Sequence, residues 1–234
     1  MAFWSRREPE DKIGYLNQFS DRGDPVELLH DLPPSAAVPD GWWELFSSSE
    51  RDRATSVLRM WKDALGDRLA KTQAYLKEHL EDIEALRWRS GLMILYSIRN
   101  RSGAMRYFVG GNPVRFSTES FTEWSPAVPE LRSFYSFQDG FSEFSSGAGL
   151  TPLAEVRSIE DLHGGAVDRP GLDLRLNPAR AYLWFSNAAG GYVGIDLDHC
   201  DHDNAFLWWV DDQPTYNLNL WDIVDEWMTI LFDD

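Results

Sequence analysis

Residues 196–203 bring together side chains that could bind a metal ion or act as a nucleophile. The stretch holds four aspartates, two histidines and the only cysteine of the chain: Asp196, Asp198, Asp201, Asp203, His199, His202 and Cys200. Thiolates and imidazoles are ligands for zinc, carboxylates are ligands for calcium, and a thiolate beside an imidazole can attack a carbonyl carbon. Three kinds of chemistry therefore have to be weighed against a fourth possibility, an acidic surface.

The spacing of these residues argues against a metal site. His199, Cys200 and His202 are nearly consecutive, so in an extended segment their side chains alternate between opposite faces. Zinc frameworks use two ligand pairs joined by a longer spacer, and the other histidines, His30, His79 and His163, are scattered. A calcium loop would need a central glycine and a glutamate at its twelfth position, and both are missing. We expect no metal and no cofactor.

The sequence also gives little support for catalysis. Cysteine nucleophiles usually take their base from a distant part of the chain, whereas His199 and His202 are sequence neighbours of Cys200. The chain contains no G-x-S-x-G, G-x-x-x-x-G-K-[ST] or H-E-x-x-H motif. We therefore expect a protein that is not an enzyme, with a metal-dependent hydrolase as an alternative.

Charge gives the strongest functional signal. The 234 residues include 22 Lys and Arg against 38 Asp and Glu, a net charge of −16. The excess belongs to residues 130–234, which hold 19 acidic and 5 basic residues, and no Lys or Arg follows Arg180. Such a surface repels phosphates and raises encounter rates with basic proteins. We expect a basic protein partner and no binding to nucleic acid, although acidity can also serve solubility alone.

We therefore interpret the acidic segment as part of a surface that meets a basic partner, with charge for steering and aromatic area for affinity. The predicted contact residues are Asp196, Asp198, Asp201, Asp203, Trp208, Asp211 and Asp212. Because neighbouring strand residues point oppositely, one of Trp208 and Trp209 should face the core. Asp196 could instead be structural, through a hydrogen bond to neighbouring backbone, and the loop could be solvated without any function. Replacing Asp198, Asp201 and Asp203 together by Asn should leave folding nearly intact.

Length and composition favour an ordinary globular protein. With 43% hydrophobic residues the chain can form one full core. Its start, MAFWSRREPEDK, lacks the apolar run of a signal peptide, and no window has the roughly 18 apolar residues of a membrane span. A single cysteine cannot form an intrachain disulfide. We expect a cytoplasmic protein that does not enter membranes.

Apolar periodicity predicts an α+β fold. Apolar residues at three- and four-residue steps predict a long helix over 47–88, which Gly66 could bend or split, and residues 92–110 read as a β-hairpin. A short helix is expected over 126–141, ended by Gly140. Strands are then expected at 181–187, 192–197 and 205–211, followed by a helix over 217–232 that Asn219 caps.

The order of motifs in the second half resembles a known family. The segments LRSFYSFQDGF, GLTPLAEV, AYLWFSNAAGGYVGIDL, AFLWWVDD and WDIVDEWMTILF follow one another from residue 131 to residue 232. Their order and spacing resemble the SUKH superfamily, which contains bacterial immunity proteins and a fungal cell-wall regulator of the same fold. Asp139-Gly140 stands at the family's turn, Leu150 to Val156 at its proline-containing strand, and Asp196 at its aspartate-bearing strand. Ala189-Gly190-Gly191 departs from the pattern, because an acidic residue often follows the glycine there.

The resemblance implies a binding scaffold that neutralises a toxin delivered between bacterial cells. It implies a small antiparallel sheet flanked by helices over residues 126–234. Residues 1–125 do not align with the family, and from their own apolar spacing we expect a helical extension and a hairpin packed on that core. Many such toxins are nucleases, which are typically basic, and the toxin's active site or substrate groove would be occluded. A non-catalytic regulatory or scaffold module, like the fungal relatives, is the alternative of the same fold. The oligomeric state stays open.

Overall fold

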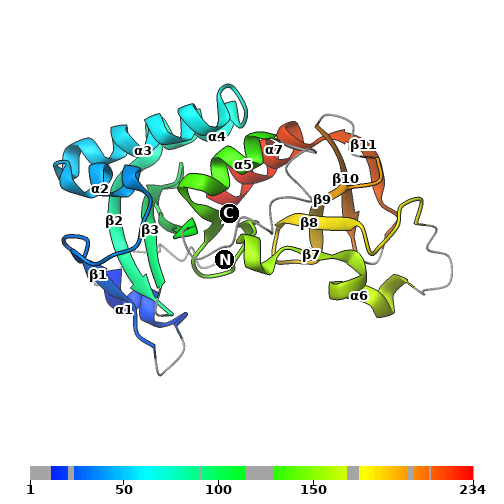
Figure 1. Ribbon diagram of the computed structural model, residues 1–234, viewed down its shortest axis with the longest axis horizontal. Helices are drawn as coiled ribbons and strands as arrows, with labels where there is room; N and C mark the ends of the chain where they lie inside the picture. Colours follow the sequence, from blue (N-terminus) through cyan, green and yellow to red (C-terminus); the bar gives the residue numbers. More distant parts are fainter. Residues whose placement is uncertain are drawn as a thin grey trace, which may run out of the picture.

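The computed structural model describes residues 12–20, 24–89, 91–113, 129–167, 174–199, 203–210 and 212–233. Within these residues the chain is α+β, with seven α-helices and one large antiparallel sheet (Figure 1). The helices are α1 (Lys12–Asn17), α2 (Asp40–Ser47), α3 (Glu50–Leu65), α4 (Ala70–His79), α5 (Pro129–Phe137), α6 (Ile159–Val167) and α7 (Leu220–Asp233), with a 3-10 helix η3 (Leu153–Glu155).

The strands occur in both halves of the chain. They are β1 (Glu27–Leu29), β2 (Leu80–Trp88), β3 (Gly91–Arg99), β4 (Met105–Gly111), β5 (Asp139–Glu143), β6 (Gly149–Leu150), β7 (Arg157–Ser158), β8 (Ala181–Ser186), β9 (Gly191–Asp196), β10 (Asn204–Trp209) and β11 (Thr215–Asn219). Their order in the sheet is β1-β2-β3-β4-β5-β6-β8-β9-β10-β11, with β7 paired to β8 off this path. Every pairing is antiparallel, and apart from β7 the order of the strands in the sheet is their order in the chain.

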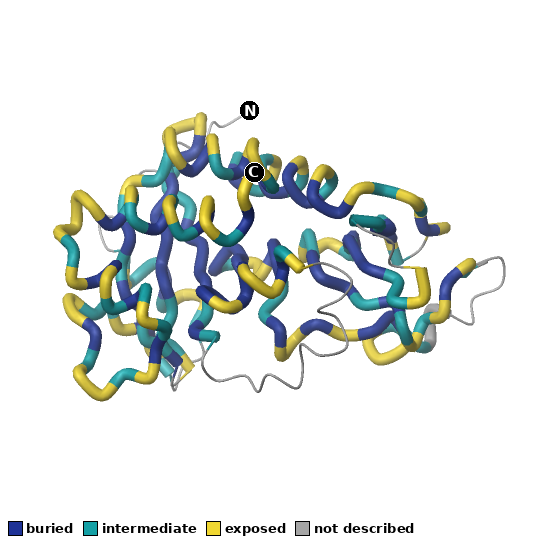
Figure 2. The backbone as a smooth tube through the Cα atoms, turned by 45° about the horizontal axis from the view of Figure 1, so that its top comes forward, coloured by how far each residue is buried: buried dark blue, intermediate teal, exposed yellow. Residues whose placement is uncertain are grey.

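The two faces of the sheet are covered differently. Helices α2, α3, α4, α5 and α7 cover one face and form the main core with it. On the other face α1 packs beneath β2–β5 and α6 packs beneath β8–β10, each over its own smaller apolar cluster. The strands and inner helix surfaces are buried, while the exposed residues follow the outer turns of the helices and the loops (Figure 2).

Side-chain alternation along the strands explains why both faces need cover. In β2, Ile83 and Ala85 enter the main core, whereas Leu86 packs with the cluster beneath α1. In β10, Ala205 enters the main core and Phe206 packs beneath α6. A strand that is apolar on both faces must be covered twice, because its side chains alternate with a period of two.

The predictions for the first half are partly wrong. The helix expected over 47–88 does break at Gly66, which has φ +57°, but it ends at His79 and residues 80–88 form β2. The hairpin expected over 92–110 is confirmed as β3 and β4. Because β1 and β2 join that hairpin, the described residues of the first half supply four strands to the large sheet, which does not match the long N-terminal helical region and the small sheet that were expected.

The second half follows the prediction more closely. Strands β8, β9 and β10 lie where they were expected, and α7 begins after Asn219, whose Oδ1 accepts hydrogen bonds from the backbone N–H groups of Trp221 (3.0 Å) and Asp222 (3.1 Å). Residues 215–219, partly assigned to that helix, form β11. Helix α5 ends at Phe137 and not at Gly140, and residues 126–128 lie outside the described ranges.

Gly140 has a different role, at the start of β5. It has φ +73°, and a Cβ there would lie 2.8 Å from the carbonyl oxygen of Leu150. Only glycine fits this close approach of β5 to β6.

Among the helices that the structure describes, none has both the length and the apolar character needed to cross a membrane.

Candidate functional site

Asp196 closes the turn after β9. Its Oδ1 accepts a hydrogen bond from the backbone N–H of Asp198 (3.0 Å), and its Oδ2 lies 2.9 Å from Nδ1 of His199. The side chain of Asp196 is only 14% exposed. The structural role considered for this residue, through neighbouring backbone, is therefore present, and Asp196 has little surface left for a partner.

Asp198 is exposed but paired. Its Oδ1 lies 2.6 Å from Nε of Arg180, the last base of the sequence, which precedes β8. Both side chains are about two-fifths exposed, 41% for Arg180 and 38% for Asp198. An exposed ion pair of this kind contributes about 0–1 kcal/mol, so Asp198 can exchange this partner for another cation.

Asp203 connects three distant parts of the chain. Its Oδ2 lies 2.6 Å from Nη1 of Arg68, in the α3–α4 connection, and its Oδ1 accepts a hydrogen bond from Nε1 of Trp221 (3.2 Å). Its backbone carbonyl accepts the N–H of Leu220 (2.7 Å) at the start of α7. The Asp203 side chain is 19% exposed. This residue links β10, α7 and the α3–α4 connection, so on the structure we predict that its replacement destabilises the fold, whereas the sequence alone led us to expect little effect from replacing it together with Asp198 and Asp201.

The carboxylates of the segment after Arg180 are thus less free of compensating charge than the sequence indicates. The absence of Lys and Arg after Arg180 led us to expect carboxylates without compensating bases. Four cations from before Ala181 reach them instead: Arg68 pairs with Asp203, Lys71 with Glu226, Arg101 with Asp233 and Arg180 with Asp198. Local charge counts miss these pairs because the sheet brings distant segments together.

The tryptophan prediction is corrected. Trp208 is fully buried beneath α6, where it packs with Ile159 and Phe206, and its Nε1 donates a hydrogen bond to the carbonyl of Asp212 (3.2 Å). Trp209 is the exposed member of the pair, at 40%. One of the two does face the interior, as expected, but Trp209 replaces Trp208 as a candidate contact residue.

The remaining predicted residues divide into two groups. Asp212 is exposed, in a turn where its backbone N–H donates to the carbonyl of Trp209 (2.9 Å). Asp201 and Asp211, like Cys200 and His202, lie outside the described residues. Among the residues that the structure does describe, no three His, Cys, Asp or Glu side chains converge as metal ligands.

Sequence reasoning missed a second surface, on the outer side of α7. Trp227 lies beside Trp209, with 5.8 Å between ring centroids, and Ile230 is 49% exposed one turn further along the helix. Asp222 and Glu226 are exposed on the same helix. The signal was present in the sequence, because α7 carries more apolar residues than one buried stripe can accommodate.

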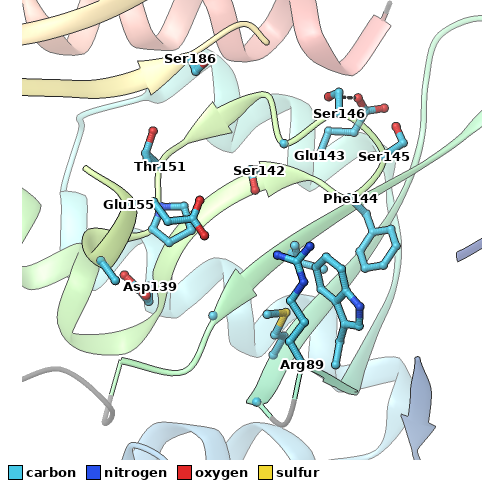
Figure 3. Close-up of a pocket in the computed structure, with 18 of the residues that line it drawn as sticks. Arg89, Asp139, Ser142, Glu143, Phe144, Ser145, Ser146, Thr151, Glu155 and Ser186 are labelled. Atoms are coloured by element: carbon cyan, nitrogen blue, oxygen red, sulfur yellow. Dashed lines mark hydrogen bonds between the residues drawn. The ribbon is translucent and has the colours of Figure 1, made fainter. Parts of the chain in front are cut away.

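Sequence reasoning also missed a groove on the opposite face of the sheet, between the areas covered by α1 and α6. Its volume is about 650 Å³, and its lining includes Asp139, Ser142, Thr151 and Glu155 (Figure 3). Arg89 contributes a charge at one end, where its guanidinium lies 4.2 Å from the ring centroid of Trp88. The groove is of mixed character, because apolar side chains such as Trp88, Phe144 and Leu183 line it together with the carboxylates, the hydroxyls and this guanidinium.

Asp139 is a buried titratable group of the groove, which Glu143 and Glu155 also line. Burial raises the pKa of Asp139 to about 6, although its Oδ1 accepts a hydrogen bond from the backbone N–H of Leu153 (2.7 Å), which lowers the pKa, and the charge of Glu155 raises it again. That hydrogen bond ties β5 to the start of η3. Glu143, at the other end of β5, forms an ion pair with Arg106 and accepts a hydrogen bond from the Ser146 hydroxyl, so the charge of this carboxylate has a partner within the fold.

Comparison with family models, with curated proteins and with solved structures gives no match for this chain.

Proposed function

We propose that this chain is an immunity protein that binds a basic, nuclease-type bacterial toxin and blocks its active site or substrate groove. The observation that carries the proposal is the charge: 38 acidic against 22 basic residues, with 19 against 5 after residue 129. Internal ion pairs rearrange this charge but leave the net value of −16 unchanged. An acidic protein of this kind attracts a phosphate-binding partner from beyond contact distance.

The order of elements from α5 to α7 gives further support. The helix α5, the Asp139-Gly140 pair at the start of β5, the strand pair β8–β9, the tryptophan-bearing β10 and the closing helix follow the order that resembles the SUKH superfamily. In that resemblance the protein acts by binding rather than by catalysis. The proposal therefore needs no metal, cofactor or catalytic residue, and it places the protein in the cytoplasm beside the toxin's target.

Co-expression with a toxin gives the test. The test takes a toxin domain from a gene found immediately upstream of this one: produced alone, that domain should arrest growth, and production of this chain should restore growth. A purified, catalytically inactive form of the same toxin domain should bind the chain stoichiometrically in calorimetry, with an association rate that falls as salt rises. Growth arrest that persists despite equal expression, together with no measurable binding, would exclude the proposal. Stoichiometric zinc in protein purified without added metal, lost when His199 and His202 are replaced, would favour a metalloenzyme instead.

A further inference from the structure

We infer that the outer face of α7, together with Trp209 at the end of β10, is the surface that docks the basic partner. This inference rests on the proposed function and names the site through which it acts. The docking surface is defined by Trp209, Ile223, Trp227 and Ile230, with the carboxylates Asp212, Asp222 and Glu226 around them. All seven belong to the segment after Arg180 that lacks Lys and Arg.

The aromatic and aliphatic residues of this surface form a neighbouring set. Trp209 and Trp227 are in ring contact, with centroids 5.8 Å apart and planes inclined at 50°. Ile223 and Ile230 stand four residues before and three residues after Trp227, which places them next to it on one side of the helix. Trp227, which is partly exposed, thus lies between two exposed residues, Trp209 at 40% on β10 and Ile230 at 49% on α7.

Packing within the fold does not account for this exposure. Helix α7 already buries Trp221, Val224, Met228 and Phe232 against the sheet and α4. Ile230 lies on the far side of the helix from that stripe, where a polar residue would cost little stability. Ile223 and Trp227 are partly buried against the main core, Trp227 with its ring centroid 5.7 Å from that of Phe185, and both keep part of their surface exposed beside Ile230. Tryptophan is also the residue type most enriched in the energetically dominant part of protein interfaces.

The surrounding charges indicate what kind of molecule fits. Asp212 and Asp222 are exposed, and Glu226 pairs with Lys71, whose side chain is 63% exposed. An ion pair that is so exposed to water contributes little stability, so Glu226 can exchange Lys71 for a cation of the partner. The rim therefore suits Lys and Arg side chains around an apolar centre, which is the arrangement that excludes water from an interface.

A second copy of this chain fits the surface poorly. In a symmetric dimer the same patch would meet itself, which would set Asp212, Asp222 and Glu226 of one copy against those of the other. Like charges placed together across an interface are unfavourable, and each copy carries a net charge of −16. The charge therefore selects a basic partner over self-association.

Two variants of the surface and one matched control test the inference. Ile230→Ser and Trp209→Ala should each weaken binding of the inactive upstream toxin domain about tenfold or more, because each removes apolar area from the centre of the interface. Ile13→Ser is the control, since Ile13 on α1 is similarly exposed, at 42%, on the other face of the sheet. It should bind the toxin domain as the unaltered chain does. Thermal melting of each variant shows whether a weakened affinity reflects unfolding.

Charge reversal gives an independent measurement. Asp222→Lys should slow association more at about 50 mM salt than at about 300 mM, because the Debye length shortens as salt rises. If the unaltered chain binds the toxin domain and the Ile230→Ser and Trp209→Ala variants bind it with the same affinity, the docking surface is overturned and the proposed function stands. The docking surface is also overturned, with the proposed function left standing, if Ile13→Ser weakens binding as much as Ile230→Ser does. No binding by the unaltered chain would overturn both.

Discussion

Arg68 and Asp203 form an ion pair between residues 135 positions apart in the chain, with 2.6 Å between Nη1 and Oδ2. Arg68 belongs to the connection between two N-terminal helices, and Asp203 stands directly before β10. The guanidinium also lies 6.0 Å from the ring centroid of Trp221, which itself donates a hydrogen bond to Asp203. This group of three residues attaches the N-terminal helices to the edge of the C-terminal strands.

Replacing Asp203 by Asn should therefore destabilise the protein. The amide cannot match the charge-assisted bonds to Arg68 and Trp221, and we expect a loss of about 1–3 kcal/mol in the free energy of unfolding. Asp198→Asn is the matched control, because its pair with Arg180 is more exposed, and it should cost at most about 1 kcal/mol. Urea denaturation of both variants measures the difference. Equal losses in the free energy of unfolding would mean that the lower exposure of the Arg68–Asp203 pair adds nothing to stability.

Asp225 should be essential for the start of α4. This aspartate of α7 is 7% exposed, and its two oxygens accept the backbone N–H groups of Lys71 (2.9 Å) and Thr72 (2.7 Å). Helix α4 has no side-chain cap of its own, since the leucine at its N-cap, Leu69, has no side-chain oxygen that could accept a hydrogen bond. Asp225→Ala should lower the free energy of unfolding by about 1–3 kcal/mol and speed hydrogen exchange at Lys71 and Thr72.

Asp222→Ala gives the comparison on the same helix. Asp222 is exposed, and its replacement should stay within about 0.5 kcal/mol of the unaltered protein. If Asp225→Ala leaves amide exchange in α4 as slow as in this control, the capping role is wrong.

Asp139 should make the protein less stable as pH rises. Its pKa is about 6 in the folded protein against an ordinary value of 3.8, so between about pH 4 and pH 6 the unfolded chain loses this proton before the folded one does. Stability from this group is thus full below pH 4 and is lost as the pH passes 6. Asp139→Asn keeps an acceptor for the Leu153 N–H and removes the ionisation.

The measurement is the free energy of unfolding of both proteins at pH 4 and pH 7. Relative to the unaltered chain, Asp139→Asn should gain of order 2 kcal/mol between the two values. A gain of zero would show that Asp139 titrates in the folded protein as it does in the unfolded chain.

Gly149 should tolerate no side chain, because β5 approaches it closely. It has φ +137°, and a Cβ there would lie 2.3 Å from the carbonyl oxygen of Phe141. Gly103 also has a positive φ, +86°, but a Cβ there would meet nothing within 4 Å. Gly103→Ala should cost about 1–2 kcal/mol from backbone strain, and Gly149→Ala clearly more, in thermal or urea unfolding. Similar losses would mean that β5 and β6 can separate at little cost.

The sequence predicted those elements whose signals are local. The hairpin of β3 and β4, the break at Gly66 and the cap at Asn219 each depend on residues close together in the chain, and all three are confirmed. Strand β2 was mistaken for helix because Leu80 and Ile83 continue the helical spacing of three and four residues that leads from Leu76. Pairing with β3 decides for the strand, and periodicity alone contains no information about that pairing.

The candidate surface shows the same limit. Alternation required that one of Trp208 and Trp209 be buried, but the choice depends on α6, which covers the face that Trp208 occupies. The compensation of Asp203 depends on Arg68, and the exposure of Ile230 depends on which side of α7 meets α4. These outcomes follow from contacts between elements far apart in the chain.

The order of pairing in the sheet has a consequence for synthesis on the ribosome. On the main path, which excludes β7, each strand after β1 pairs with a strand that precedes it in the chain. Along the path from β1 to β11, every strand finds its partner already made when it emerges, so the sheet can grow in the order of translation. Helix α7 follows all of these strands, yet it supplies Asp225 to α4 and Asp233 to Arg101. Until α7 has been translated the main core lacks one of its walls, and the nascent chain should stay sensitive to proteases up to that point.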